Sequence, residues 1–224
     1  MQSINTIPKA KLTRAIKPEV IDIDTFFILI RNSQIKKGLI YDYSGIIFTT
    51  PDSDSGKKIL QNLSFFHHLT GENVTFYMPG YSVTPCGEPA TKIDQTPYYF
   101  NMEDYIGFIH QLEKVTSWQY SGESEFLLFE VIDGTPNLDC VMIMNIDGML
   151  RDKTIESIPK FMQDLVRLCD DYSSLKKTSN TWGIKILLKK IEEIILSKLP
   201  KELADLYKTG KHFCTYNIKK AQPS

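Results

Sequence analysis

The sequence lacks the spaced cysteines and histidines that usually identify a metal site or a redox site. It has four cysteines, which lie far apart and form no C-x-x-C pair: Cys86, Cys140, Cys169 and Cys214. The spacing typical of zinc ligands or of a thiol–disulfide motif is therefore missing. None of the four histidines lies four residues from another, so no helix offers two of them to one metal ion. We therefore expect no metal site.

Long apolar runs and an excess of one charge are also missing. Residues 1–11 carry no apolar run of the kind found in signal peptides, and no segment approaches the roughly 20 apolar residues needed to span a bilayer. The 26 basic and 27 acidic residues nearly cancel, which argues against a dedicated nucleic-acid or membrane-surface binder. These absences predict a cytoplasmic protein with reduced cysteines, no membrane contact and no nucleic-acid partner.

What the sequence does contain is centred on residues 46–81. An apolar run is followed by a polar loop at 50–56, by apolar residues at helical spacing over 57–70, and by a second apolar run over 73–78. Gly71 comes after the helical segment, where a left-handed stop is expected. The pattern predicts one parallel βαβ unit, and both of its outgoing loops should open on the same edge of the sheet.

The neighbouring segments extend this predicted sheet. Two apolar runs rich in β-forming residues, 23–30 and 38–49, predict strands that are joined in a hairpin or interrupted by a bulge at Gly45. The prolines and glycines of 79–97 predict a long irregular loop. Three further elements are expected downstream: a helix over 101–115 capped by Asn101, and an antiparallel hairpin of strands 125–132 and 139–146.

The last part of the chain changes character. Apolar residues at helical spacing predict one helix near 157–172 and a second over 182–198, followed by a basic tail from Lys211. The fold class predicted is α/β, with a mixed, mostly parallel sheet flanked by helices and a C-terminal helical pair. The predicted organisation is an N-terminal arm over 1–20, a sheet domain over 21–150 and C-terminal helices over 151–224 packed on that domain.

The loop over 49–57 is the first candidate for a ligand site. Hydroxyl groups, a glycine and a lysine at the start of a helix are suited to holding a phosphate group, and Asp52, Ser55 and Lys57 are the candidate ligand-binding residues. Tyr81, after the second strand, is the candidate for stacking on a ligand. The loop is not a P-loop, because one glycine precedes the lysine and no Ser or Thr follows it. The alternative is a well-capped helix beside a solvated loop.

The candidates for a reactive group are weaker. Cys86 lies in a turn rich in proline and glycine, which would expose its sulfur, and Asp133 begins a second turn on the chain. A third possibility is the acidic pair Glu123 and Glu125, which would support acid–base chemistry if one carboxyl were desolvated. Each has a simpler alternative: an unreactive loop cysteine and solvated acids.

Two functions of different classes follow. The first is a non-catalytic protein-interaction or assembly subunit, bound to a protein partner or to copies of itself, because no catalytic motif is present. The alternative is a binding protein or enzyme for a small nucleotide-like or phosphorylated compound, with its site at the carboxyl ends of the strands. The sequence identifies no cofactor and does not decide whether the protein is an enzyme.

Overall fold

The computed structural model of the protein describes residues 16–20, 22–37, 41–70, 74–85, 88–93, 95–139, 141–175 and 213–219. The described helices are α1 (Ile23–Lys37), α2 (Asp54–Gln61), α3 (Leu63–Thr70), α4 (Met102–Val115), α5 (Ile146–Arg151) and α6 (Ile158–Leu175). The described strands are β1 (Ile16–Val20), β2 (Tyr41–Phe48), β3 (Val74–Pro79), β4 (Tyr81–Ser82), β5 (Glu88–Ile93), β6 (Thr96–Phe100), β7 (Glu125–Ile132), β8 (Thr135–Pro136), β9 (Val141–Asn145) and β10 (Phe213–Tyr216).

The main sheet is mixed, with strand order β1-β3-β2-β7-β9-β10 and with β8 paired to β7. Strands β1 and β2 both run parallel to β3. The pairs β2·β7, β7·β9, β9·β10 and β7·β8 are antiparallel. The mixed α/β class is therefore confirmed, whereas antiparallel pairs outnumber parallel ones among the described strands, so a mostly parallel sheet is not confirmed.

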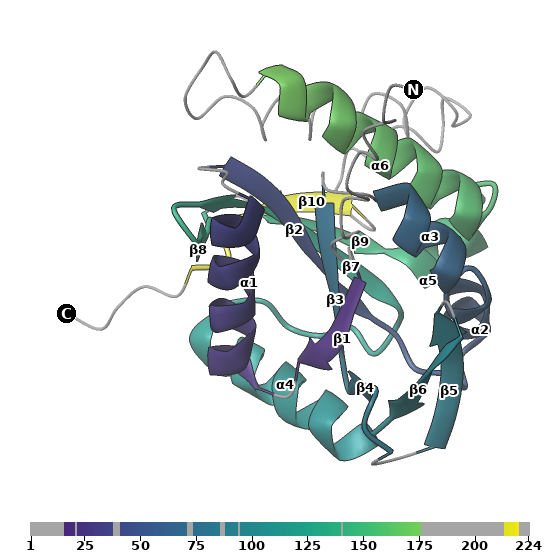
Figure 1. Ribbon diagram of the computed structural model, residues 1–224. Helices are drawn as coiled ribbons and strands as arrows, with labels where there is room; N and C mark the ends of the chain where they lie inside the picture. The colour runs from purple at the N-terminus through teal and green to yellow at the C-terminus, as the bar shows by residue number, and fades with distance from the viewer. Residues whose placement is uncertain are drawn as a thin grey trace, which may run out of the picture.

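Helices cover both faces of this sheet (Figure 1). On one face, Phe26 of α1 meets the rings of Tyr77 and Phe129 edge-on, and α4 packs beside α1. On the other face, Phe126 of β7 contacts Phe161 of α6, which packs in turn against α2 and α3. Because Phe126 and Phe129 are three residues apart on one strand, they point to opposite faces. The core therefore has two apolar layers with the sheet between them.

The segment 23–30 is helical, so the predicted strand and hairpin there were wrong. Asp22 caps the start of α1 by accepting a hydrogen bond from Thr25 N at 2.7 Å. The buried apolar residues of α1 are Ile23, Phe26 and Ile30, which share one helical face toward the sheet. Two isoleucines on the outer side of the helix hide this periodicity in the sequence.

The central βαβ unit is confirmed. β2 and β3 are adjacent and parallel, with Tyr43 opposite Val74 and Ile46 opposite Tyr77. The predicted single helix over 57–70 is instead two helices, since Asn62 ends α2 by donating its N–H to Ile59 O at 3.1 Å. Gly45 of β2 lies beneath the ring of Phe76, where an added Cβ would come within 2.6 Å of that ring. Close packing of β2 against β3 therefore requires glycine at this position.

The described residues within 79–97 do not form an irregular loop. Strands β4, β6 and β5 form a small antiparallel sheet in that order. The register shifts between Pro89 and Thr91, so a bulge accommodates the proline. Ordered strands thus occupy the place where proline content alone predicts a loop.

The two ends of the described chain also join the main sheet. β1 pairs with β3 at one edge, although 1–20 was expected to be an arm, and β10 pairs with β9 at the other edge, within the segment expected to be a basic tail. Three predictions are confirmed: the helix over 101–115 is α4, the first C-terminal helix is α6, and β7 and β9 pair antiparallel as the predicted hairpin. The predicted helix over 182–198 lies outside the described residues. Of the helices that the structure describes, none is both long enough and apolar enough to cross a bilayer.

Candidate functional site

The carboxyl ends of β2 and β3 lie side by side, as the predicted parallel unit requires. The loop after β2 therefore lies near Tyr81, whose hydroxyl donates to Thr49 O at 3.1 Å. Since β7 runs antiparallel to β2, its beginning reaches the same edge, and Glu125 pairs with Phe48. We call this edge the carboxyl-end rim, made up of residues 49–57, Tyr81 and 120–125.

Buried hydroxyl groups tie the rim together. Ser124 Oγ lies 2.9 Å from Thr49 Oγ1 and 2.7 Å from Ser55 Oγ. The backbone N–H of Ser124 donates to Asp147 Oδ2 at 2.7 Å. Ser55, a predicted ligand-binding residue, is thus buried within the protein's own network. In the described part of the chain the bonding partners of the Ser55 and Ser124 hydroxyls include no base, so neither serine is set up as a nucleophile.

Ser53 caps the start of α2, so the free N–H groups there are partly used by the protein itself. Ser53 Oγ accepts a hydrogen bond from Gly56 N at 2.9 Å, and Ser53 O accepts one from Lys57 N at 2.9 Å. An added Cβ on Gly56 would lie only 1.9 Å from Thr50 O, because the loop folds tightly over the helix start. Asp52 and Lys57 are exposed on the outside of this loop. The arrangement is that of a capped helix, with two of its N–H groups already in use.

Tyr81 lies inside the core, with 2% of its surface exposed. Its ring centroid is 4.9 Å from that of Phe100. Burial, followed by the nearby negative charge of Asp52, raises the pKa of the Tyr81 hydroxyl above its ordinary value. Tyr81 is therefore a neutral, buried residue whose hydrogen bond positions the loop after β2. Its ring packs against Phe100 inside the core, so it is not placed to stack on a ligand.

Asp133 does not belong to the rim. Tyr41, at the start of β2, pairs with Ile132, at the end of β7. Asp133 therefore follows at the opposite edge of the sheet, so this candidate reactive group cannot share a site with the loop over 49–57. The reason is that β7 is antiparallel to β2, which sends its outgoing turn away from the carboxyl-end rim. Cys86 lies outside the described residues.

Glu125 is the titratable group of the rim with the most unusual surroundings. It is 4% exposed, and within the described structure its Oε2 atom has no hydrogen-bond partner of standard geometry. Burial raises the pKa of the Glu125 carboxyl; interactions with Ser121 and Trp118 oppose the shift, and the charge of Glu123 adds to it. Neighbouring Glu123 differs, since it accepts hydrogen bonds from Asn145 at 2.6 Å and from Arg151 at 2.9 Å. The two acids are close in sequence but differ in surroundings: Glu125 is buried, whereas Glu123 is held by hydrogen bonds from Asn145 and Arg151.

Replacing Glu125 with glutamine is expected to change how stability depends on pH. The raised pKa means that the folded state binds this proton more tightly than the unfolded state does, so ionisation destabilises the wild type as pH rises above the unfolded value. The variant cannot ionise at this position. Its free energy of unfolding, relative to wild type, should therefore increase from acidic to neutral pH, which denaturant titrations at several pH values would measure. A difference independent of pH would contradict the buried, shifted carboxyl.

Replacing Ser124 with alanine is expected to destabilise the protein by about 1–3 kcal/mol, because the buried hydroxyls of Thr49 and Ser55 would both lose a partner. Chemical denaturation of the variant measures this cost. Ser82→Ala is the matched control, since the hydroxyl of Ser82, at the end of β4, accepts a single exposed hydrogen bond, from Thr84 N at 3.0 Å. Equal effects of the two substitutions would show that the hydroxyl network does not stabilise the rim.

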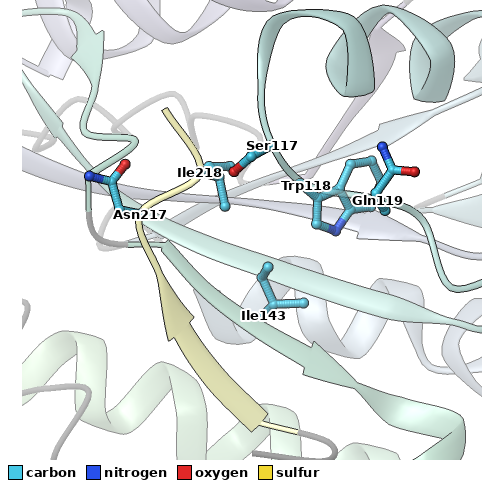
Figure 2. A pocket seen from close by; sticks show the side chains of 6 residues that line it. All are labelled: Ser117, Trp118, Gln119, Ile143, Asn217 and Ile218. Carbon is cyan, nitrogen blue, oxygen red and sulfur yellow. The ribbon is translucent and has the colours of Figure 1, made fainter. Parts of the chain in front are cut away.

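A pocket that the sequence did not suggest lies between the segment after α4 and the segment after β10 (Figure 2). Its volume is about 260 Å³, and its lining residues are Ser117, Trp118, Gln119, Ile143, Asn217 and Ile218. The N–H of Ser117 donates to Ile218 O at 2.8 Å, which joins the segment after α4 to the segment after β10. Pairing between residues about 100 positions apart builds this pocket, so no local sequence pattern could have revealed it.

The described residues include no group of three His, Cys, Asp or Glu side chains positioned to hold a metal ion. The rim offers hydroxyls and carboxylates that are mostly bonded to the protein itself. In comparisons with known proteins, no family model, no curated protein and no solved structure matches this chain.

Proposed function

We propose that the protein is a non-catalytic interaction subunit, which binds another protein chain through the outer side of the α1–α4 layer. The observation that carries this proposal is the distribution of exposed apolar side chains. Of the large apolar side chains exposed in the described part, all but Phe65 lie on these two helices. Ile28 (58% exposed) and Ile35 (66%) share one side of α1, and Met102 (46%) and Ile106 (44%) share one side of α4; Val115 (42%), nine residues after Ile106, lies on another side of α4.

These side chains are left over after the core has been filled. The inner side of the layer is closed by Phe26 of α1 and Phe108 of α4, whose ring centroids are 5.6 Å apart. Met102 and Ile106 are four residues apart, so they share one side of α4. Full burial of one such side chain is worth roughly 1.5–3 kcal/mol, so a partner that covers several of them gains a useful binding free energy.

The carboxyl-end rim also supports the proposal, because its polar groups are bonded to one another. Its serine hydroxyls bond to one another, its helix start is capped, and its tyrosine lies in the core. A catalytic serine needs a base within reach, and the described partners of Ser55 and Ser124 include none. The rim is therefore better suited to stabilising the fold than to turning over a substrate.

Site-specific photocrosslinking in cells tests the proposal. A photoreactive amino acid replacing Ile28 or Ile106 should give a discrete adduct of higher mass, because these positions lie within the proposed contact surface. The control carries the same group in place of Lys58, which is exposed on α2, in the layer on the other face of the sheet. Adducts of equal yield at all three positions, or none at Ile28 and Ile106, would overturn the proposal.

A second candidate function is the binding of a small polar ligand at the rim, and Glu125 favours it. Burying the Glu125 carboxyl costs free energy, since its Oε2 atom has no hydrogen-bond partner of standard geometry among the described residues, and a polar ligand bound there would offset this cost. A thermal-shift screen with nucleotides, phosphorylated sugars and amines tests this function. A ligand that stabilises the wild type but not Glu125→Gln would support it, and no shift with any compound would count against it.

A further inference from the structure

The outer side of α1 carries a narrow stripe of four exposed residues: Asp24, Ile28, Arg31 and Ile35. Their spacing of four, three and four residues places all of them on one line along the helix. The same spacing forms the contact seam of paired helices in coiled coils. In Figure 1, α1 stands in front of the sheet with β8 beside it, and the stem of the Arg31 side chain lies against Gly134 of the turn before β8. The stripe therefore has the pattern of a helix that pairs with another helix.

The order of charges along the stripe indicates which helix would pair with α1. Asp24 lies one turn before Ile28, and Arg31 lies about one turn after it. In an antiparallel pair of two copies centred near Ile28, Asp24 of each copy lies opposite Arg31 of the other. In a parallel pair, aspartate would face aspartate and arginine would face arginine. The stripe is thus complementary to itself in one orientation only, as a two-fold symmetric interface requires.

We propose that α1 pairs antiparallel with α1 of a second copy of this chain, across a two-fold axis near Ile28. This inference rests on the proposed function and names the partner that the α1–α4 layer binds. The two isoleucines at position 28 pack against each other at the axis, and an Asp24–Arg31 pair flanks them on each side. Neither charged residue has an ion-pair partner among the described residues, so both are available to the second copy.

The expected dimer is weak. A stable interface usually buries about 1,600 Å² in total, and one helix stripe supplies only part of that area. Exposed ion pairs contribute little individually. Because the interface is symmetric, every substitution acts twice, so single changes should have large effects on the dissociation constant.

Sedimentation velocity of the full chain, across micromolar concentrations, tests the pairing. Ile28→Glu places two like charges at the axis and should weaken the dimer at least about tenfold. Phe65→Glu is the matched control, since Phe65 is 47% exposed on α3, in the layer on the other face of the sheet, and should leave the dimer unchanged. Asp24→Arg alone should weaken the dimer, whereas Asp24→Arg combined with Arg31→Asp should restore it, because the reversed charges again face their opposites.

The outcomes separate this inference from the proposed function. A dimer that is lost with Ile28→Glu and recovered in the double charge reversal supports antiparallel pairing. A dimer unaffected by Ile28→Glu, or a chain that is monomeric at every concentration, overturns the pairing. If the crosslink from position 28 joins a different protein, the interaction function stands and the self-pairing fails. Thermal unfolding of each variant confirms that the exposed substitutions leave the fold intact.

Discussion

Replacing Phe26 with alanine is expected to lower the free energy of unfolding by about 3–5 kcal/mol, the largest effect of any single substitution considered. Phe26 is 2% exposed, and its ring contacts those of Tyr77, Phe108 and Phe129 at centroid distances of 5.1, 5.6 and 6.1 Å. These contacts join α1, α4 and two strands of the sheet at one point. Removing the ring leaves a cavity that the surrounding elements cannot all close at once.

Urea denaturation of the variant measures this loss. Phe65→Ala is the matched control, because Phe65 is 47% exposed and the same atoms are removed from a surface position of α3. We expect the control to cost less than about 1 kcal/mol. If both substitutions cost the same, α1 is not packed on the sheet as a helix, and the stripe on its outer side loses its basis.

The second large effect is expected for Gly56→Ala. The new Cβ would lie 1.9 Å from Thr50 O, 2.6 Å from Ser53 Oγ and 2.8 Å from Thr49 Oγ1. The nearest of these is a backbone atom, which cannot rotate away, so the loop after β2 must shift and the cap of α2 must open. We expect a loss of about 3 kcal/mol, at the upper end of the usual cost of overpacking.

The control for this prediction is Gly107→Ala. Gly107 is a glycine within α4, and an added Cβ there meets nothing within 4 Å. Alanine is the better helix former by about 1 kcal/mol, so this variant should be slightly more stable than wild type. Opposite signs for the two substitutions, measured by denaturation, would confirm the tight loop. A neutral Gly56→Ala would contradict the close approach of Thr50 O.

Local patterns predicted the fold well where one periodicity dominates. The parallel unit of β2 and β3, the capped helix α4 and the hairpin of β7 with β9 all follow from apolar spacing and end signals within about 40 residues. The helix α1 was misassigned because Ile28 and Ile35 occupy its outer side, so that its apolar residues no longer mark one face. A helix that carries apolar residues on both sides resembles a strand in sequence.

Elements that depend on distant partners were not predictable in this way. The small sheet of β4, β6 and β5 is built from proline-rich segments that gain order by pairing with each other. β10 gains its place from β9, to which Phe213 pairs opposite Met144. Propensity within a short segment cannot report such pairing.

The candidate site shows the same division. The sequence correctly placed the loop after β2 and Tyr81 at one edge, because both follow parallel strands. It could not show that Ser124 bonds to Thr49 and Ser55, since the direction of β7 was needed for that. The same direction moved Asp133 to the far edge. The direction of β7, rather than residue type, decided which side chains meet.

The position of β10 at the edge of the main sheet has a consequence for biosynthesis. A ribosome releases β7 and β9 long before residues 213–216 are made, and until then the outer edge of β9 offers unpaired N–H and C=O groups to any extended peptide nearby. At that stage a nascent chain can pair wrongly with other nascent chains that are being made on the same mRNA. Chaperone dependence during translation, and rescue of a chain truncated before residue 213 by a synthetic peptide spanning β10, would reveal this vulnerable interval.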